Sequence, residues 1–330
     1  MTGTDTTGGL WRHLRRGGGL LREHGLWLTA LLSVGVFAGL FLLADAEAVT
    51  RSLLSVDGWT LVTVLALVVV SYAVRFLKWG FYLRELDIDV PLGSSLLTFF
   101  SGLMLVVTPG KLGEVWKAWF LRDREGIPAS RTTAVVGAER ITDLLALSAL
   151  AVLGVVVYRR SPAVLLAVGG TFLAGLALLQ WRTACLAVLD RLATLPVVGP
   201  HAASLESFYE GTYALFRPRP LAVAMVLSVL AWGLEGAALW VILAGLGADA
   251  SLVVGLFVFG LGSVVGAVSL LPGGLAATEA SMVGLLVALG VARTVAVSST
   301  LLVRVGTLWF GAALGTAVFG LSRLSGRADR

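Results

Sequence analysis

Charged residues are scarce in this chain of 330 residues: Asp, Glu, Lys and Arg make up 14% of it, against about 25% in soluble domains. Hydrophobic residues make up 57%, and the mean hydropathy is +0.91. This balance excludes an ordinary soluble protein. The apolar runs are long and continuous, without the short alternating segments of a membrane β-barrel. The sequence therefore predicts an all-α integral membrane protein.

Cysteine and histidine are also nearly absent. Cys185 is the single cysteine, which excludes an intrachain disulfide and a cysteine metal cluster. The three histidines lie scattered in polar segments, so we expect no metal site, and no cofactor is indicated. The net charge of +5 comes with basic residues that flank apolar runs. That placement fits cytoplasmic loops beside an anionic leaflet and argues against nucleic-acid binding.

Polar loops divide the chain into membrane spans. Residues 1–26 form a basic N-terminal segment, 27–322 a single polytopic membrane domain, and 323–330 a short basic tail. Loop charges predict that both termini are cytoplasmic in a multi-pass protein of the cell membrane. Residues 45–57, with more acidic than basic side chains, are predicted to be an outer loop. The count is about six full transmembrane helices plus two re-entrant hairpins, or eight or more spans if each hairpin crosses.

Two Pro-Gly breaks interrupt apolar runs at corresponding places in the two halves of the chain. The first proline precedes a turn glycine by 17 residues and the second by 18, and an arginine follows each glycine by 14. We interpret this as an inverted repeat, about 59–181 and 220–320, although chance recurrence in a Gly-rich chain is an alternative. Paired broken helices are typical of transporter binding sites. The predicted break residues are Pro109, Gly110, Gly113, Pro272, Gly273 and Gly274.

Several charged residues inside or beside these apolar runs are candidates for a substrate site. Each charge costs ~2.5–3.5 kcal/mol near the bilayer centre, so it must be paired or line a wet cavity. A buried ion-pair network that only locks the helices together is the alternative. The positive and negative side chains balance in number. Arginine, however, can bond a phosphate through two N–H groups at once, which favours an anionic substrate. The candidates are Lys111, Glu114, Glu139, Arg140, Asp143, Glu279 and Arg304.

Three further features leave alternatives open. Lys111 follows the first break at a helix start, where free N–H groups favour an anion, but an interfacial helix with solvated lysines also fits Lys111 and Lys117. Arg75 and Glu235 occupy equivalent repeat positions, and snorkelling of Arg75 to the membrane surface is the favoured interpretation of that residue. Asp87-Ile88-Asp89 has the spacing of a metal-binding acidic pair, which makes a membrane glycosyltransferase the enzymatic alternative.

Three motifs carry a family resemblance: Pro109-Gly110-x-x-Gly113-Glu114, then Glu139-Arg140-x-x-Asp143, then Pro272-Gly273-Gly274-Leu275 followed by Glu279. With them the chain resembles the membrane domain of the lysylphosphatidylglycerol synthases, a flippase-like family with stand-alone members, over about residues 25–322. Position 276, usually glycine in that family, is alanine here.

The resemblance implies a lipid transporter, or flippase, that moves a phospholipid or a polyprenyl-phosphate-linked glycan between leaflets. The soluble domain that attaches lysine in the synthases has no counterpart in this sequence, so we do not expect an enzyme. An accessory subunit of cell-envelope lipid synthesis is a further alternative. The expected partners are membrane lipids and a lipid substrate with an anionic head group, and a homo-oligomer or a complex with an envelope-biosynthesis enzyme stays open.

Overall fold

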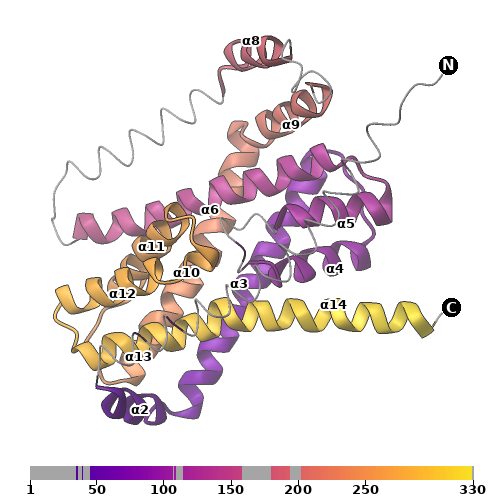
Figure 1. Ribbon diagram of the computed structural model, residues 1–330. Coiled ribbons are helices and arrows are strands. Elements are labelled where there is room, and N and C mark those ends of the chain that lie inside the picture. Colours follow the sequence, from indigo (N-terminus) through magenta and orange to yellow (C-terminus); the bar gives the residue numbers. More distant parts are fainter. Residues whose placement is uncertain are drawn as a thin grey trace, which may run out of the picture.

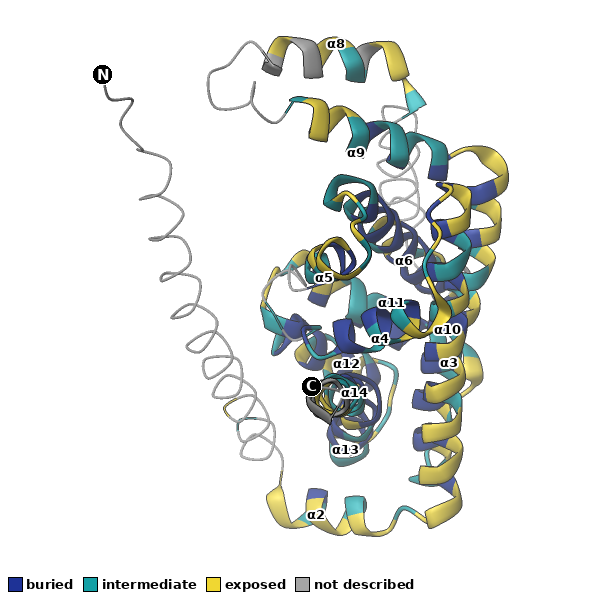
Figure 2. Cartoon of the chain, turned by 90° about the vertical axis from the view of Figure 1, so that its right-hand side faces the viewer, coloured by how far each residue is buried: buried dark blue, intermediate teal, exposed yellow. Residues whose placement is uncertain are grey.

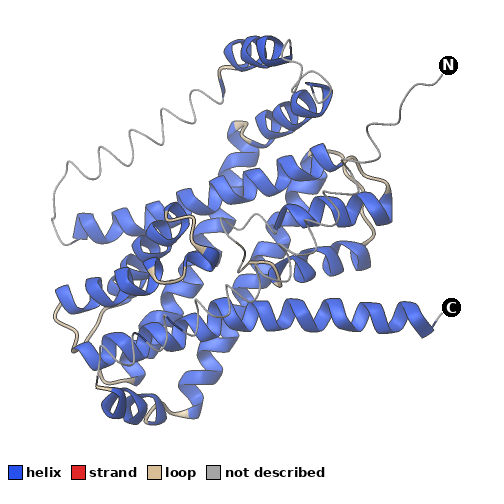
Figure 3. Cartoon of the chain, in the orientation of Figure 1, coloured by secondary structure: helices blue, strands red, loops and turns tan. Residues whose placement is uncertain are grey.

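The computed structural model describes residues 45–106, 108, 114–157, 180–193 and 202–328, with residues 35 and 39, and these ranges contain helices and no strand (Figures 1 and 3). The prediction of an all-α fold is confirmed. The start of the predicted membrane domain, residues 27–44, lies outside the described residues except for residues 35 and 39. Pro109, Gly110, Lys111 and Gly113 also lie outside them. The helices are α2 (Ala46–Leu54), α3 (Gly58–Glu85), α4 (Leu92–Leu103), α5 (Trp116–Glu125), α6 (Ala129–Val157), α8 (Arg182–Ala193), α9 (Ala202–Leu215), α10 (Pro218–Gly245), α11 (Leu252–Val268), η3 (Pro272–Gly274), α12 (Ala277–Ala288), α13 (Arg293–Arg304), the π-helical η4 (Val305–Trp309) and α14 (Phe310–Ala328).

Three of the described helical segments are long and apolar enough to cross a membrane: α3, α10 and the continuous run from α13 through η4 into α14. The 28 residues of α3 extend about 42 Å, more than the ~30 Å hydrocarbon core. Asp57 caps its start, because the carboxylate accepts hydrogen bonds from the backbone N–H and the hydroxyl of Thr60. The flank of α3 that holds Leu61, Val69 and Leu77 is exposed and apolar, as expected of a lipid-facing surface (Figure 2).

Two helices beside the Pro-Gly breaks, α4 before the first and α12 after the second, are too short to cross. The 12 residues of α4 and the 12 of α12 each extend only about 18 Å. At the second break, Gly273 and Gly274 have φ of 60° and 67°, in the left-handed region that glycine enters without strain. The turn glycines that define the repeat, Gly126 and Gly290, are left-handed as well. The break at Pro272 is therefore observed as the sequence predicts.

The helices of the two halves correspond in order and spacing. α3 and α10 both have 28 residues and begin 160 residues apart, as do α4 and α11, whereas α6 and α13 begin 164 apart. α3 and α10 pack side by side and antiparallel, because Thr60 lies against Gly245 and Lys78 bonds Ser228 (Figure 2). Each half also exchanges a helix, since α4 packs on α14 and α11 packs on α6 (Figure 1). The two exchanges are symmetric, as expected if the halves are repeats; the repeat bounds of 59–181 and 220–320 stay a prediction.

One segment differs from its predicted form. The loop expected over 45–57 contains the helix α2, because the Asp45 carboxylate accepts from the backbone N–H groups of Glu47 and Ala48, both at 3.1 Å, and so starts a helix. Between α6 and α10 lie two shorter helices, α8 and α9, and α9 packs on α6.

Candidate membrane-embedded site

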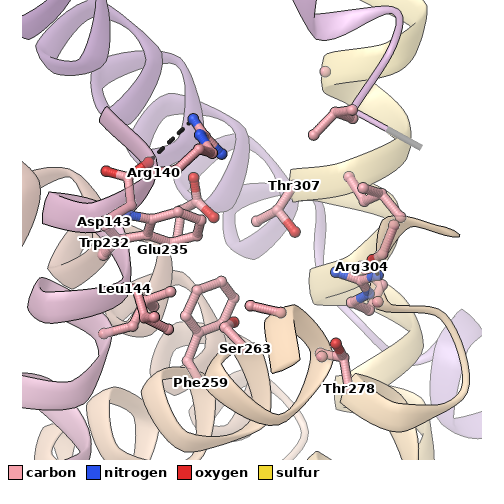
Figure 4. Close-up of a pocket in the computed structure, with 18 of the residues that line it drawn as sticks. Arg140, Asp143, Leu144, Trp232, Glu235, Phe259, Ser263, Thr278, Arg304 and Thr307 are labelled. Carbon is pink, nitrogen blue, oxygen red and sulfur yellow. Dashed lines mark hydrogen bonds and ion pairs between the residues drawn. The ribbon is translucent and has the colours of Figure 1, made fainter. Parts of the chain in front are cut away.

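A cavity of about 360 Å³ lies between the two halves of the chain (Figure 4). Arg140 and Asp143 of α6 stand on one side of it, and Arg304 of α13 stands across from them. Trp232 and Glu235 of α10 lie beside Asp143 in this view, and Phe259 and Ser263 of α11 lie below. Thr278, Thr307, Gly273 and Gly274 add polar and backbone surface near Arg304. The cavity is therefore charged on opposite walls and aromatic between them.

A continuous chain of ion pairs supports the α6 wall. Asp143 holds two cations, with Oδ1 2.5 Å from Lys78 Nζ and Oδ2 3.2 Å from Arg140 Nη2. Arg140 Nη2 lies 3.0 Å from Glu114 Oε2, and Lys117 Nζ lies 3.6 Å from that same oxygen. Lys117 also reaches Glu139 at 3.3 Å. Cations and anions thus alternate along the chain, so every acid in it except Glu139 touches two cations.

Both lysines of this chain are buried. Lys78 is 1% exposed and also donates to Ser228 at 2.8 Å. Lys117 is 2% exposed, with Nζ about 5 Å from the ring centres of Trp79 and Phe99. The interpretation of α5 as an interfacial helix with solvated lysines is therefore wrong for Lys117. Burial is tolerated because carboxylates and aromatic rings replace the water that each ammonium loses.

Arg75 and Glu235 form a second ion pair where α3 crosses α10. Arg75 Nη2 is 2.6 Å from Glu235 Oε1, which also accepts from the Ser71 hydroxyl at 3.0 Å. The Arg75 guanidinium lies 3.8 Å from the ring centre of Trp232. The favoured interpretation of Arg75 as a snorkelling residue is wrong: its repeat-equivalent acid holds it inside the protein. The two charges at equivalent positions meet because α3 and α10 are antiparallel.

Arg304 forms the third group, at the second Pro-Gly break. Its Nε lies 2.5 Å from Glu279 Oε1, and its Nη2 donates to the Gly273 carbonyl at 2.7 Å. Glu279 is fully buried in the first turn of α12, and its Oε2 has no hydrogen-bond partner. Directly after Arg304 the helix widens into η4, and the Tyr72 hydroxyl donates to the carbonyl of Thr307 there. The arginine is thus fixed between a helix break and a π-turn.

Comparison with known proteins identifies this architecture. Residues 30–315 match the family described as the lysylphosphatidylglycerol synthase TM region. The chain belongs to this family. A UPF0104 membrane protein of Methanothermobacter thermautotrophicus is 28% identical over 313 residues, covering 87% of this chain and 90% of that protein. A UPF0104 membrane protein of Pyrococcus horikoshii is 24% identical over 315 residues, covering 86% and 94%. The resemblance inferred from the motifs is confirmed, and the apolar helices make this family member a multi-pass membrane protein.

The family's motif residues take different places around the cavity. Arg140, Asp143 and Arg304 line it together with Gly273 and Gly274. Glu114 and Glu279 hold the two arginines without lining it, and Glu139 lies further along the chain of ion pairs, paired with Lys117. Lys111 and the three break residues Pro109, Gly110 and Gly113 lie outside the described residues. A role in substrate binding stays a prediction for every one of these side chains.

Sequence reasoning missed Lys78 and favoured the wrong interpretation of Arg75. A signal was available: Ser71, Arg75, Lys78 and Tyr82 recur at helical spacing, which places four polar side chains on one face of an apolar helix. Arg75 and Lys78 lie in the second half of α3, toward the end where a long basic side chain can snorkel to the surface. That interpretation was preferred over a buried polar face.

The acidic pair that suggested a glycosyltransferase lies elsewhere. Asp87 and Asp89 are exposed in the turn after α3, on either side of the buried Ile88, and neither lines the cavity. Within the described ranges of this family member, no cluster of three or more His, Cys, Asp or Glu is arranged to hold a metal ion.

Proposed function

We propose that this protein is a lipid transporter that moves a phosphate-bearing lipid between membrane leaflets. The observation that carries the proposal is that Arg140 and Arg304, one from each half of the chain, reach the same cavity. Two guanidinium groups on opposite walls suit a phosphate, because each can donate two parallel N–H bonds to its oxygens. A phospholipid and a polyprenyl-phosphate-linked glycan both present that group.

The rim of the cavity suits the lipid tails. Leu144, Val268 and Leu271 line the cavity and are also exposed on the outside, with Val268 69% exposed. The polar interior therefore continues into an apolar outer surface. A head group can enter while its acyl or prenyl chains remain in the bilayer, which avoids the cost of burying the whole lipid.

The charge arrangement supports reversible binding. Cations and anions are equal in number among the described groups of the site: Arg75, Lys78, Lys117, Arg140 and Arg304 against Glu114, Glu139, Asp143, Glu235 and Glu279. A phosphate must therefore compete with carboxylates for the arginines. When Arg140 turns to a phosphate, Asp143 keeps Lys78 and Glu114 keeps Lys117, so neither acid is left alone. Loading thus changes the contacts between the halves, which is how a ligand shifts a transporter between inward-open and outward-open states.

Orientation in the cell membrane with both termini cytoplasmic completes the proposal and rests on the loop charges. No chemical step is proposed, because the charged side chains that line the cavity are held in ion pairs within the protein, and the acidic pair Asp87 and Asp89 lies outside it.

The test is lipid movement by the purified protein in liposomes, measured with fluorescent phosphatidylglycerol and a membrane-impermeant quencher. Arg140→Lys and Arg304→Lys keep the positive charge but lose the paired N–H donors that can bond two phosphate oxygens at once. Loss of one charged hydrogen bond costs about 1.5–3 kcal/mol, so we expect a fall of roughly 10- to 100-fold. Arg51→Lys, in an exposed pair on α2, is the matched control and should keep the parent rate. Parent rates in both cavity variants, at normal folding, would refute phosphate capture by the arginines.

A further inference from the structure

We propose that Glu279 is a proton-binding site that couples proton movement to lipid movement. This inference rests on the proposed function, because it follows from Arg304 leaving Glu279 to bind a lipid phosphate. It adds what the lipid proposal leaves open, namely the ion whose gradient drives transport.

The carboxylate of Glu279 has one charged partner, and one of its two oxygens makes no hydrogen bond. Oε1 pairs with Arg304 Nε at 2.5 Å, whereas Oε2 is buried without a hydrogen-bond partner. Arg304 lines the cavity and Glu279 does not, so the guanidinium stands between the carboxylate and the cavity. Movement of Arg304 toward a phosphate would uncover the acid to the cavity and remove its counter-charge at the same time.

The acid that holds the other cavity arginine is placed differently. Glu114 touches both Arg140 and Lys117, and it retains the lysine when the arginine moves. No second cation lies within ion-pair distance of Glu279 in the described part of the chain. A buried carboxylate that loses its only cation is strongly disfavoured as an anion, and it becomes neutral by taking up a proton. The two halves therefore respond to loading in different ways.

Among the described residues, the surroundings of Glu279 offer no other compensating charge. Of the helices that pack closely on α12, α11 has no titratable residue, and α13 supplies Arg304 and, at its exposed start, Arg293. α12 itself has no other charged residue. The N-terminal dipole of α12 favours the anion, but this effect is smaller than that of a buried ion pair. The charged groups across the cavity are Arg75, Arg140, Asp143 and Glu235, which are already paired with one another or with neighbours.

The proton balance is simple. A proton from water in the cavity binds the Glu279 carboxylate as Arg304 moves to the phosphate, and it returns to water when the lipid leaves and Arg304 pairs with Glu279 again. If loading and release occur at opposite leaflets, one proton crosses with each lipid anion. Lipid movement then responds to a pH gradient.

The direct test measures proton uptake on lipid binding, in weakly buffered detergent with a pH-sensitive dye. The probe is short-chain phosphatidylglycerol, whose phosphodiester does not titrate near neutral pH. We expect uptake approaching about one proton per bound lipid, lost in Glu279→Gln and kept in Glu47→Gln, which changes an exposed ion pair on α2. Binding without uptake would overturn the inference and leave the proposed function intact, whereas absence of binding would contradict the proposed function itself.

Two measurements on the unmodified protein guard against a variant that does not fold. Infrared difference spectra should show a protonated carboxylic acid appearing with lipid, and its absence would contradict the inference. In liposomes, an imposed pH gradient should accelerate lipid movement in the direction of proton flow. Acceleration by a sodium gradient instead, with no effect of pH, would replace the proton with a metal cation and overturn the proposal.

Discussion

The ion pair between Lys78 and Asp143 makes an unusual mutational prediction: removing the lysine should rescue loss of the acid. Asp143 is the only carboxylate within ion-pair distance of Lys78 among the described residues, whereas Asp143 also has Arg140. The two single substitutions are therefore not equivalent. Asp143→Asn strands a buried ammonium, but Lys78→Met leaves Asp143 with a cation.

The expected magnitudes follow from these contacts. An uncompensated buried charge costs about 3–5 kcal/mol, so Asp143→Asn should destabilise the protein by that amount. Lys78→Met loses hydrogen bonds to Asp143 and Ser228 but strands no charge, and should cost about 1–3 kcal/mol. In the double variant Arg140 still has Glu114, so the cost should return to about 1–3 kcal/mol.

Unfolding in mixed micelles, followed by tryptophan fluorescence across a denaturant series, measures the three free energies. Glu47→Gln, in an exposed ion pair on α2, is the control and should change stability by less than about 0.5 kcal/mol. If the double variant is less stable than Asp143→Asn, the two residues do not act as a buried pair, and the chain of ion pairs described here is wrong.

Two further predictions concern the breaks. If α4 and α5 form a re-entrant hairpin, the exposed positions Arg84 and Arg124 both face the cytoplasm. Each is changed singly to Cys in a protein with Cys185 replaced, and both should then be labelled from the cytoplasmic side. Labelling from opposite sides would show that the segment between them crosses the membrane. Ala276 has φ of 67° at the N-cap of α12, so Ala276→Gly should relieve strain and raise the free energy of unfolding by about 1 kcal/mol, and a loss of stability would contradict that account.

Elements that depend on local chemistry were predictable from the sequence. The long helices α3 and α10 coincide with uninterrupted apolar runs between polar turns, which are visible in the sequence. Gly126 and Gly290 mark turns because the backbone there is left-handed. The resemblance gave glycine as the usual residue at position 276, and the backbone explains that preference. The φ of 67° there is one that glycine adopts without strain and alanine does not.

The partners of the buried charges could not be predicted in the same way. Helix packing decides which charges pair. Lys78 and Asp143 are 65 residues apart in the sequence, and Arg75 and Glu235 are 160 apart, so no local pattern encodes these pairings. Lys117 looks solvated on a helical wheel, yet α4 and α6 cover it. Arg140 and Arg304 were chosen for their matched repeat spacing and for their position in apolar runs, and the structure brings both to one cavity; their role there is still a prediction.

The central claim is that the two arginines hold a lipid phosphate, and native mass spectrometry of lipids that co-purify with the protein tests it most directly. The unmodified protein should retain a lipid whose fragments contain phosphate. The Arg140→Gln/Arg304→Gln double variant, confirmed as folded by gel filtration, should lose it, whereas Arg51→Gln should not. A retained lipid without phosphate, or equal retention by the double variant, would contradict the claim.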